Sequence, residues 1–167
     1  SRRSAPSLMV DGQFLVSAAK RDHRVMSDPA SSSDAPVRVL IVDSDERTRE
    51  SLVGLLAIGD RVTVVGEAGQ PARALELALE TSPDLVVIDP RLPELDGGLA
   101  FIGTLRATVP GVRVLAMSWS DALEAAAIEG GADAFVRKTF RSSELVAAVR
   151  ACCEPDDDTP RSSDGAW

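Results

Sequence analysis

Short apolar runs alternate along the middle of the chain with segments in which apolar residues recur every three or four positions. The runs are rich in Val, Ile and Leu and end at polar or turn-forming residues, which is typical of buried strands. The segments between them are typical of amphipathic helices. The pattern predicts strands at 37–42, 62–68, 84–89, 112–117 and 133–138, and helices at 45–58, 70–81, 99–107, 120–129 and 142–153.

The strict alternation of strand and helix predicts an α/β fold built on one five-stranded parallel sheet. Because every strand is apolar throughout, helices are expected on both faces, and right-handed crossovers then give an open, doubly wound sheet. The periodicity does not give the order of the strands. A Pro- and Gly-rich loop is predicted at 89–98. Ligands of such sheets bind outside the carboxyl ends of the strands, so the residues that directly follow strands are the candidates for chemistry.

Composition divides the chain into three parts. Residues 37–153 carry the periodic pattern and are predicted to form one domain. Residues 1–36 are polar and are predicted to be a flexible extension, of which 1–25 are either a leader foreign to the native protein or a genuine extension with a trimmed start. Residues 154–167 hold five acidic residues and one arginine and are predicted to be a solvated tail without a DNA-reading element.

Charge and cysteine content exclude several classes of protein. The net charge is −8, from 18 basic and 26 acidic residues, which argues against duplex nucleic-acid binding by this chain itself. No apolar run approaches the ~20 residues that cross a bilayer, so no membrane partner is expected. Cys152 and Cys153 are adjacent, have no zinc-site spacing and suit a reducing cytoplasm. His23 has no partner for catalysis in the sequence and receives no catalytic role.

Charged residues follow three of the predicted strands. Asp43 follows the first strand, Asp89 ends the third and Lys138 ends the fifth. Carboxylates that meet at one edge repel each other unless a cation binds, and their oxygens suit Mg²⁺. An aspartate beside a metal and an ammonium group is equipped for phosphoryl transfer. Single strand-end residues often only cap helices or solubilise loops, but three strand ends in one sheet favour a phosphoryl-transfer site.

Three segments of the sequence resemble the receiver domain of two-component response regulators. They are VRVLIVDSDERTRESLVGLL, PDLVVIDPRLPELDGG and GADAFVRKTF, and the resemblance covers 37–153. The run VGEAGQPARALELALETSPD is most similar to the NarL/LuxR-like class, whose members usually carry a helix-turn-helix output domain. The resemblance implies a flavodoxin-like fold with strand order 2-1-3-4-5. It also implies a cytoplasmic protein of phosphorelay signalling and transcription regulation, with a sensor histidine kinase as partner.

The resemblance also implies roles for individual residues. Asp89 would accept the phosphoryl group and Lys138 would pair with it. Asp43 and the backbone carbonyl of Arg91 would help Asp89 hold Mg²⁺. Phe135 would be the mobile aromatic residue of the family. A homodimer is expected through the face formed by helix 120–129, strand 133–138 and helix 142–153.

The sequence departs from the family pattern at three positions. Ser44 stands where the family has a second acid, and a neutral hydroxyl is a weaker Mg²⁺ ligand than a carboxylate. Asp45 substitutes for that acid only if the loop shifts. Ala116 stands where the family has Thr or Ser, and a methyl group cannot donate a hydrogen bond. Ser118 shares its strand face but is expected to lie too far along, and Thr139 replaces the usual proline.

Two functional hypotheses are supported about equally. The first is a receiver phosphorylated on Asp89 that signals through protein contacts. The second is an atypical receiver that binds a protein or ligand without phosphorylation, because Ser44 and Ala116 replace a metal ligand and the switch hydroxyl. A third and weaker hypothesis is a haloacid-dehalogenase-type phosphatase with Asp43 as nucleophile and Asp45 as acid. Arg47 and the lack of a visible cap domain count against it.

Overall fold

A computed structural model describes residues 35–139 and 141–154 of the protein. Most of the extension expected at 1–36 and of the tail expected at 154–167 lies outside these residues, as does His23, so the expectations for them stay predictions. Within the described residues, no helix combines the length and the apolar character needed to cross a bilayer.

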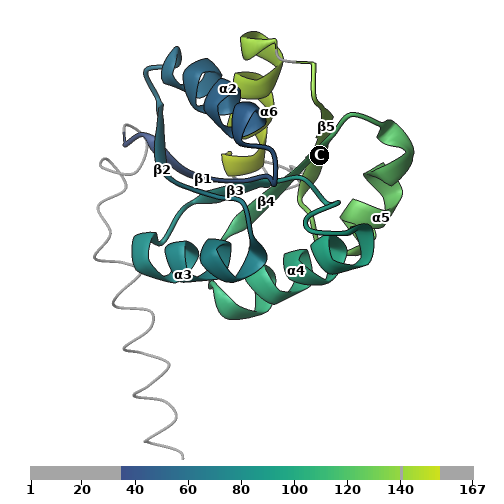
Figure 1. The fold of residues 1–167 in the computed structure, drawn as a ribbon. Coiled ribbons are helices and arrows are strands. Elements are labelled where there is room, and N and C mark those ends of the chain that lie inside the picture. The colour runs from purple at the N-terminus through teal and green to yellow at the C-terminus, as the bar shows by residue number, and fades with distance from the viewer. Residues whose placement is uncertain (1–34, 140, 155–167) are drawn as a thin grey trace, which may run out of the picture. The chain divides into compact units, whose positions relative to one another are not determined.

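The described chain forms one five-stranded sheet in which every pair of neighbouring strands is parallel (Figure 1). The strand order is β2-β1-β3-β4-β5, which confirms the doubly wound, flavodoxin-like fold. The apolar runs predicted the strands to within two residues at either end. Their bounds are β1 Val37–Val42, β2 Val62–Ala68, β3 Leu85–Ile88, β4 Arg113–Ser118 and β5 Ala134–Arg137.

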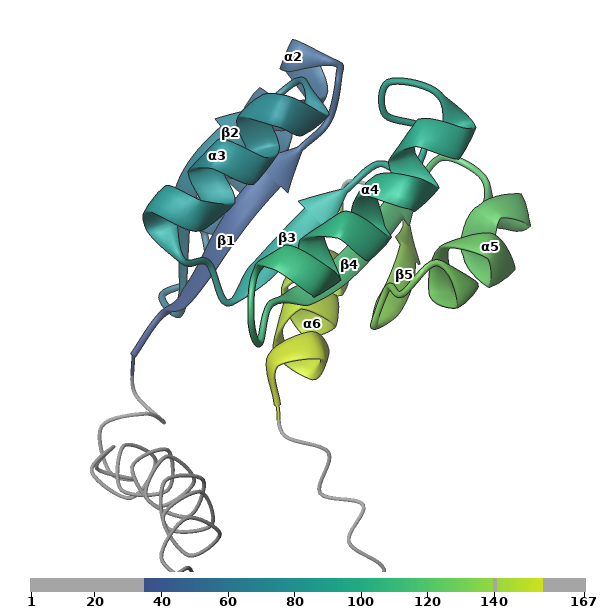
Figure 2. The same ribbon diagram turned by 90° about the horizontal axis from the view of Figure 1, so that it is seen from below.

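Helices cover both faces of the sheet, as the apolar strands require. The helices form two groups, one on each face of the sheet, as Figures 1 and 2 show from two directions. The first pair is α2 (Glu46–Ala57) and α6 (Ser142–Cys153). The second group is α3 (Pro71–Thr81), α4 (Leu95–Thr108) and α5 (Glu124–Glu129).

Strand alternation divides the core into two layers, one on each face of the sheet. On β1, Leu40 and Val42 pack with the layer under α3, α4 and α5. Val39 and Ile41 pack with the layer under α2 and α6. Because aliphatic side chains fill both layers, the charged residues are left for the strand ends.

Two helices differ from the sequence prediction. Helix α4 begins at Leu95 rather than at Leu99, so the loop predicted at 89–98 is shorter than expected. The cause is packing: a Cβ at Gly98 would lie 2.0 Å from the carbonyl oxygen of Pro90, so only glycine lets the loop and the helix meet. The helix predicted at 120–129 begins as a 3₁₀ turn, Asp121–Leu123, and only then continues as α5.

The two cysteines end helix α6, and both are free thiols. Cys152 is buried among the side chains of the α2–α6 layer, and Cys153 is partly buried. Burial raises the pKa of both thiols, in the case of Cys153 to about 11. Both therefore stay protonated near neutral pH and serve as small apolar residues.

Candidate functional site

The structure brings together the three charged residues that the strand ends predicted. Asp43 follows β1 and Asp89 follows β3, which are neighbours in the sheet. Lys138 follows β5, and its Nζ lies 2.5 Å from Asp43 Oδ2 and 2.7 Å from Asp89 Oδ2. All three are buried, with exposed fractions of 3%, 8% and 5%. The long lysine side chain thus reaches from the end of β5 past β4 to the two carboxylates at the ends of β3 and β1.

Main-chain groups fix both carboxylates. The amide of Asp45 donates to Asp43 Oδ1 at 2.9 Å, and the amide of Arg91 donates to Asp89 Oδ1 at 2.9 Å. In each case the donor lies two residues after the aspartate, the geometry in which Asp stabilises a turn. Each loop therefore turns away directly after its strand and leaves the second carboxylate oxygen directed to Lys138.

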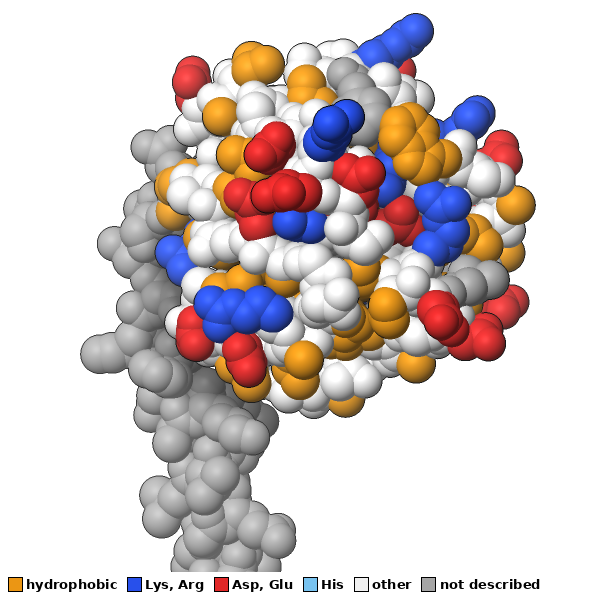
Figure 3. Space-filling model, viewed as in Figure 1, with side chains coloured by type: hydrophobic (Ala, Val, Ile, Leu, Met, Phe, Trp, Pro, Cys, Tyr) orange, Lys and Arg blue, Asp and Glu red, His pale blue; other side chains and the backbone are white. Residues whose placement is uncertain are grey.

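A second cation lies against Asp89. The Arg91 guanidinium contacts it through Nε at 3.4 Å from Oδ1 and through Nη2 at 3.4 Å from Oδ2. Burial raises the pKa of Asp89, but the hydrogen bonds from Lys138 and from the Arg91 amide outweigh it, so this pKa lies below its ordinary value. Asp89 is therefore ionised at neutral pH, as a nucleophile must be. Figure 3 shows acidic and basic side chains close together near the middle of this face.

The resemblance found in the sequence implies Mg²⁺ at this edge, but these residues fit a divalent cation poorly. The Ser44 side chain is exposed. The exposed Asp45 is the N-cap of α2 and uses Oδ1 to accept from the amide of Thr48 at 2.9 Å, which lowers its pKa. Among the described residues, no three His, Cys, Asp or Glu side chains are grouped so as to hold a metal. Lys138 and Arg91 already balance the two carboxylates.

The two residues expected to respond to phosphorylation, Ala116 and Phe135, lie in strands β4 and β5 and contact the core. Ala116 is buried in β4, where it pairs with Ile88 on one side and Phe135 on the other. Phe135 is partly buried and packs against the core layer under α3, α4 and α5. Thr139 does not extend β5 but donates through Oγ1 to Glu144 at the start of α6, at 2.6 Å. None of these contacts supplies a hydroxyl beside Asp89.

Two residues at the end of β4 were not predicted to belong to the site. Ser118 is fully buried, and its carbonyl oxygen accepts the amide hydrogen of Lys138 at 2.9 Å. The half-exposed Trp119 ring lies 5.8 Å from Lys138 Nζ, within cation–π range. The sequence analysis considered Ser118 but expected it to lie too far along the strand, and Trp119 carries no charge that would have indicated a role.

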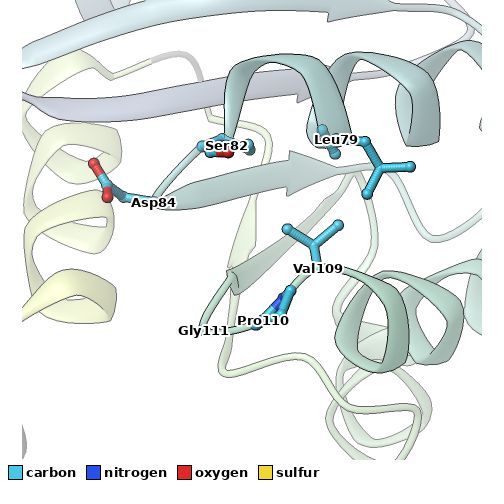
Figure 4. A pocket seen from close by; sticks show the side chains of 8 residues that line it. Leu79, Ser82, Asp84, Val109, Pro110 and Gly111 are labelled. Carbon is cyan, nitrogen blue, oxygen red and sulfur yellow. The ribbon is translucent and has the colours of Figure 1, made fainter. Parts of the chain in front are cut away.

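A hollow of about 240 Å³ lies at the opposite edge, where β3 begins (Figure 4). Leu79 and Val109 line it, together with the turn residues Ser82 and Pro110. Asp84 also borders the hollow, but its carboxylate points away from the other labelled side chains in Figure 4 and accepts a hydrogen bond from the amide of Arg38 at 2.8 Å. No cluster of reactive groups borders this hollow within the described residues, so the chemistry belongs to the other edge.

Comparison with known protein families decides what kind of domain this is. The family model for the response regulator receiver domain matches residues 39–150. The chain belongs to the response regulator receiver family. Its receiver fold has a TM-score of 0.65 with the signal receiver domain of the putative response regulator NarL from Mycobacterium tuberculosis. The two are 36% identical, and the match covers 71% of this chain and 97% of that one.

Curated relatives of this receiver are response regulators. The probable transcriptional regulatory protein NarL of Mycobacterium tuberculosis is 35% identical over 134 residues, 79% of this chain and 60% of the relative. Response regulator MprA of Mycolicibacterium vanbaalenii is 35% identical over 73% of this chain and 54% of its own. DNA-binding transcriptional activator DevR/DosR of Mycobacterium tuberculosis is 36% identical over 68% and 53%.

The match spans 53–60% of the length of these curated relatives. Their similarity supports the NarL/LuxR-like class that the sequence indicated. The phosphatase hypothesis gains no support, because Asp45, its acid, is instead the N-cap of α2.

Proposed function

We propose that this receiver accepts a phosphoryl group on Asp89 from a sensor histidine kinase in the cytoplasm and signals through protein contacts. The observation that carries the proposal is the shared lysine. Lys138 bridges Asp43 and Asp89 at 2.5 and 2.7 Å, so an ionised nucleophile and a fixed cation lie side by side at the carboxyl edge of the sheet. Membership of the receiver family supports the same assignment.

The step is a phosphoryl transfer. An Asp89 carboxylate oxygen attacks phosphorus, an O–P bond forms, and the P–N bond to the kinase histidine breaks. The bonding electron pair returns to the imidazole, which takes a proton from water. Lys138 and Arg91 neutralise charge that develops on the phosphoryl oxygens, since both lie within 3.4 Å of the carboxylate. Asp43 keeps the ammonium group in place through its own ion pair.

A second candidate is a binding module that works without phosphorylation. It is favoured by the internal balance of charge, in which the cations Lys138 and Arg91 already contact the acidic side chains. It is also favoured by Ser44, whose exposed hydroxyl replaces the second acid. In such a module the carboxylates stabilise the loops, and a partner recognises the edge in its unmodified state.

The role of the whole protein is proposed to resemble that of its curated relatives. Those named as transcriptional regulators support transcription control as the role of the whole protein. A homodimer is proposed through α5, β5 and α6, the face that the sequence indicated, and Ile128 of α5 is an exposed apolar side chain at 44%. Sedimentation velocity before and after phosphorylation tests this, and an unchanged monomer in both states contradicts it.

The mass of the intact protein separates the two candidates. The chain is incubated with acetyl phosphate, with and without Mg²⁺, beside an Asp89→Asn variant. A single phosphoryl adduct in the wild type that is absent from the variant supports phosphorylation. Because Arg91 and Lys138 supply the positive charge, the adduct is expected to depend only weakly on Mg²⁺. A folded wild type that gains no adduct from acetyl phosphate or from a kinase favours the binding module.

A further inference from the structure

Arg91 places three nitrogen donors on the Asp89 carboxylate. Its amide lies 2.9 Å from Oδ1, its Nε lies 3.4 Å from the same oxygen, and its Nη2 lies 3.4 Å from Oδ2. Lys138 Nζ is a further donor, at 2.7 Å from Oδ2. An ionised carboxylate has about four lone-pair sites, and these donors occupy all of them. Any other group that binds Asp89 must therefore displace one of these donors.

The donors differ in how easily they can leave. The Lys138 side chain is only 2% exposed and is held by Asp43 as well. The Arg91 amide is fixed by the turn that follows β3. The Arg91 side chain, in contrast, is 47% exposed, and its two contacts are the longest of the set. Since an exposed ion pair contributes little to stability, the guanidinium is the donor that leaves first.

The charges at this edge suit an anion better than a divalent cation. Asp43 and Asp89 carry two negative charges, which the directly bonded Lys138 and Arg91 balance. A divalent cation would be repelled by the buried ammonium group. It would also find no third carboxylate grouped with these two among the described residues, since Ser44 offers only a hydroxyl. A phosphoryl group is attracted by the same two cations.

The shape of the guanidinium fits both states of Asp89. Its planar fork can contact two carboxylate oxygens or two phosphoryl oxygens in the same way. When an Asp89 oxygen bonds phosphorus, it gives up a lone pair, so a donor must leave the carboxylate. The phosphoryl oxygens become acceptors at the same moment. A rotation of the half-exposed Arg91 side chain carries the fork from one set of oxygens to the other and leaves the Arg91 amide in place.

We propose that the Arg91 guanidinium takes the place of the divalent cation at this edge. It holds the Asp89 carboxylate before transfer and shifts onto the phosphoryl oxygens afterwards, while the Lys138 ammonium group stays fixed. This inference rests on the proposed phosphorylation of Asp89. It follows that phosphoryl transfer requires Arg91 and requires no divalent cation.

The first experiment measures how fast the intact protein gains a phosphoryl group from acetyl phosphate, in EDTA and in excess Mg²⁺. An Asp89 oxygen forms the bond to phosphorus, and acetate leaves with the electron pair of the broken O–P bond. The wild type should be labelled at nearly the same rate in both buffers. Arg91→Ala should be labelled about tenfold more slowly in EDTA, because it loses charge-assisted hydrogen bonds to the phosphoryl group. Arg91→Lys keeps the charge without the fork and should be intermediate.

Arg73→Ala is the matched control. Arg73 is also a half-exposed arginine, and its Nη1 lies 3.0 Å from Glu76 of the same helix. This variant removes the same charge elsewhere and should be labelled at the wild-type rate. A wild type that is labelled only in Mg²⁺ overturns the role of Arg91 and leaves the phosphorylation of Asp89 standing. Labelling of Arg91→Ala at the wild-type rate in EDTA does the same.

The second experiment tests the cation place without any phosphoryl group, with Mn²⁺ as the probe and the paramagnetic resonance of the free ion as the readout. The wild type should show no saturable binding. Ser44→Asp supplies the second acid, and adding Arg91→Ala to it should strengthen Mn²⁺ binding about fivefold, because the guanidinium no longer competes for Asp89. Equal affinities of the single and double variants, or saturable binding by the wild type, overturn the inference. A wild type that gains no adduct in either buffer overturns the proposed function, and the Mn²⁺ series then decides alone whether Arg91 holds the cation place.

Discussion

The two edges of the sheet both carry aspartates, yet the carboxylates are satisfied in different ways. At the amino-terminal edge, Asp84 precedes β3 and Asp133 precedes β5. Asp84 accepts from the amide of Arg38 at 2.8 Å. Asp133 Oδ2 accepts from the amide of Val114 at 2.7 Å and from Arg106 Nη1 at 2.8 Å. Each of these carboxylates joins the main chain of a neighbouring strand, so each helps to hold two strands in register.

At the carboxyl-terminal edge the two carboxylates instead share one partner, Lys138. Asp43 and Asp89 both bond Lys138, and their main-chain donors come from their own loops rather than from another strand. The Ser118 hydroxyl has no hydrogen-bond partner at the same edge. The shared lysine links the ends of β1, β3 and β5 through side chains, but neither carboxylate bonds the main chain of a neighbouring strand. The edge concentrates charge and donor capacity, which is what a site for a phosphoryl group requires.

The difference shows that the partner of an aspartate, rather than its position, separates a structural role from a functional one. Asp43, Asp84, Asp89 and Asp133 all lie next to apolar strands, so the sequence does not distinguish their roles. Asp133 is balanced by Arg106 and Arg113, whose side chains are each 41% exposed, and by the main-chain amide of Val114. Asp43 and Asp89 both depend on one buried lysine, so removing it leaves two buried carboxylates without their cation. Substitutions at this edge should therefore have the largest effects on stability.

The largest effect is expected for Lys138→Met. Removing this buried ammonium group leaves Asp43 and Asp89 buried without their shared cation, which should lower the free energy of unfolding by about 3 kcal/mol. Urea unfolding measures it. The control is Arg113→Met at the other edge, where Nη1 lies 3.5 Å from Asp133 Oδ1 and the side chain is 41% exposed. That change should cost less than about 1 kcal/mol. Equal losses at the two edges would contradict the comparison.

The next effect concerns the loop that carries Asp89 rather than its charge. In Gly98→Ala the new Cβ would lie 2.0 Å from the Pro90 carbonyl oxygen, so the loop or α4 must move. The expected loss is about 2–3 kcal/mol, with slower labelling of Asp89 by acetyl phosphate. Gly103→Ala in the same helix is the matched control, because the nearest atom lies 3.9 Å away. It should stabilise the protein by about 0.5–1 kcal/mol through helix propensity.

Much of this fold could be predicted from periodicity alone. The strands are mostly apolar because helices cover both faces of the sheet, and this pattern can be recognised in the sequence without any knowledge of contacts. The start of α4 could not be predicted, since Gly97 and Gly98 oppose a helix unless the close approach to Pro90 is known. The opening of α6 was anticipated at Ser142, but no serine caps it there: the N-cap is Arg141, without a side-chain hydrogen bond.

The site was predictable in part for a similar reason. The rule that parallel strands gather their carboxyl ends at one edge sufficed to bring Asp43, Asp89 and Lys138 together. It could not show that the Arg91 side chain returns to Asp89, because a rotamer is not encoded in spacing. It also gave Ser118 no place at the site, since burial without a partner is a property of the packed chain.

The smallest expected effect is a change in the pH dependence of stability. Burial raises the pKa of Asp89, but the hydrogen bonds from Lys138 and the Arg91 amide lower it by more than burial raises it. The pKa in the folded state therefore lies below the unfolded value of about 3.9. A group of this kind stabilises the fold above the unfolded pKa and loses that contribution as the pH falls through the folded one. The wild type should therefore lose more stability than Asp89→Asn between about pH 5 and pH 3.

Thermal unfolding of both proteins across that range measures the difference, which should stay within about 1 kcal/mol because only one group differs and the range covers only part of its titration. The sign matters more than the size. A wild type that loses less stability than the variant on acidification would mean that burial outweighs the two cations and that Asp89 prefers to be protonated. The carboxyl-terminal edge would then hold a neutral acid rather than a nucleophile, and the contrast with the paired aspartates of the amino-terminal edge would rest on Asp43 and Lys138 alone.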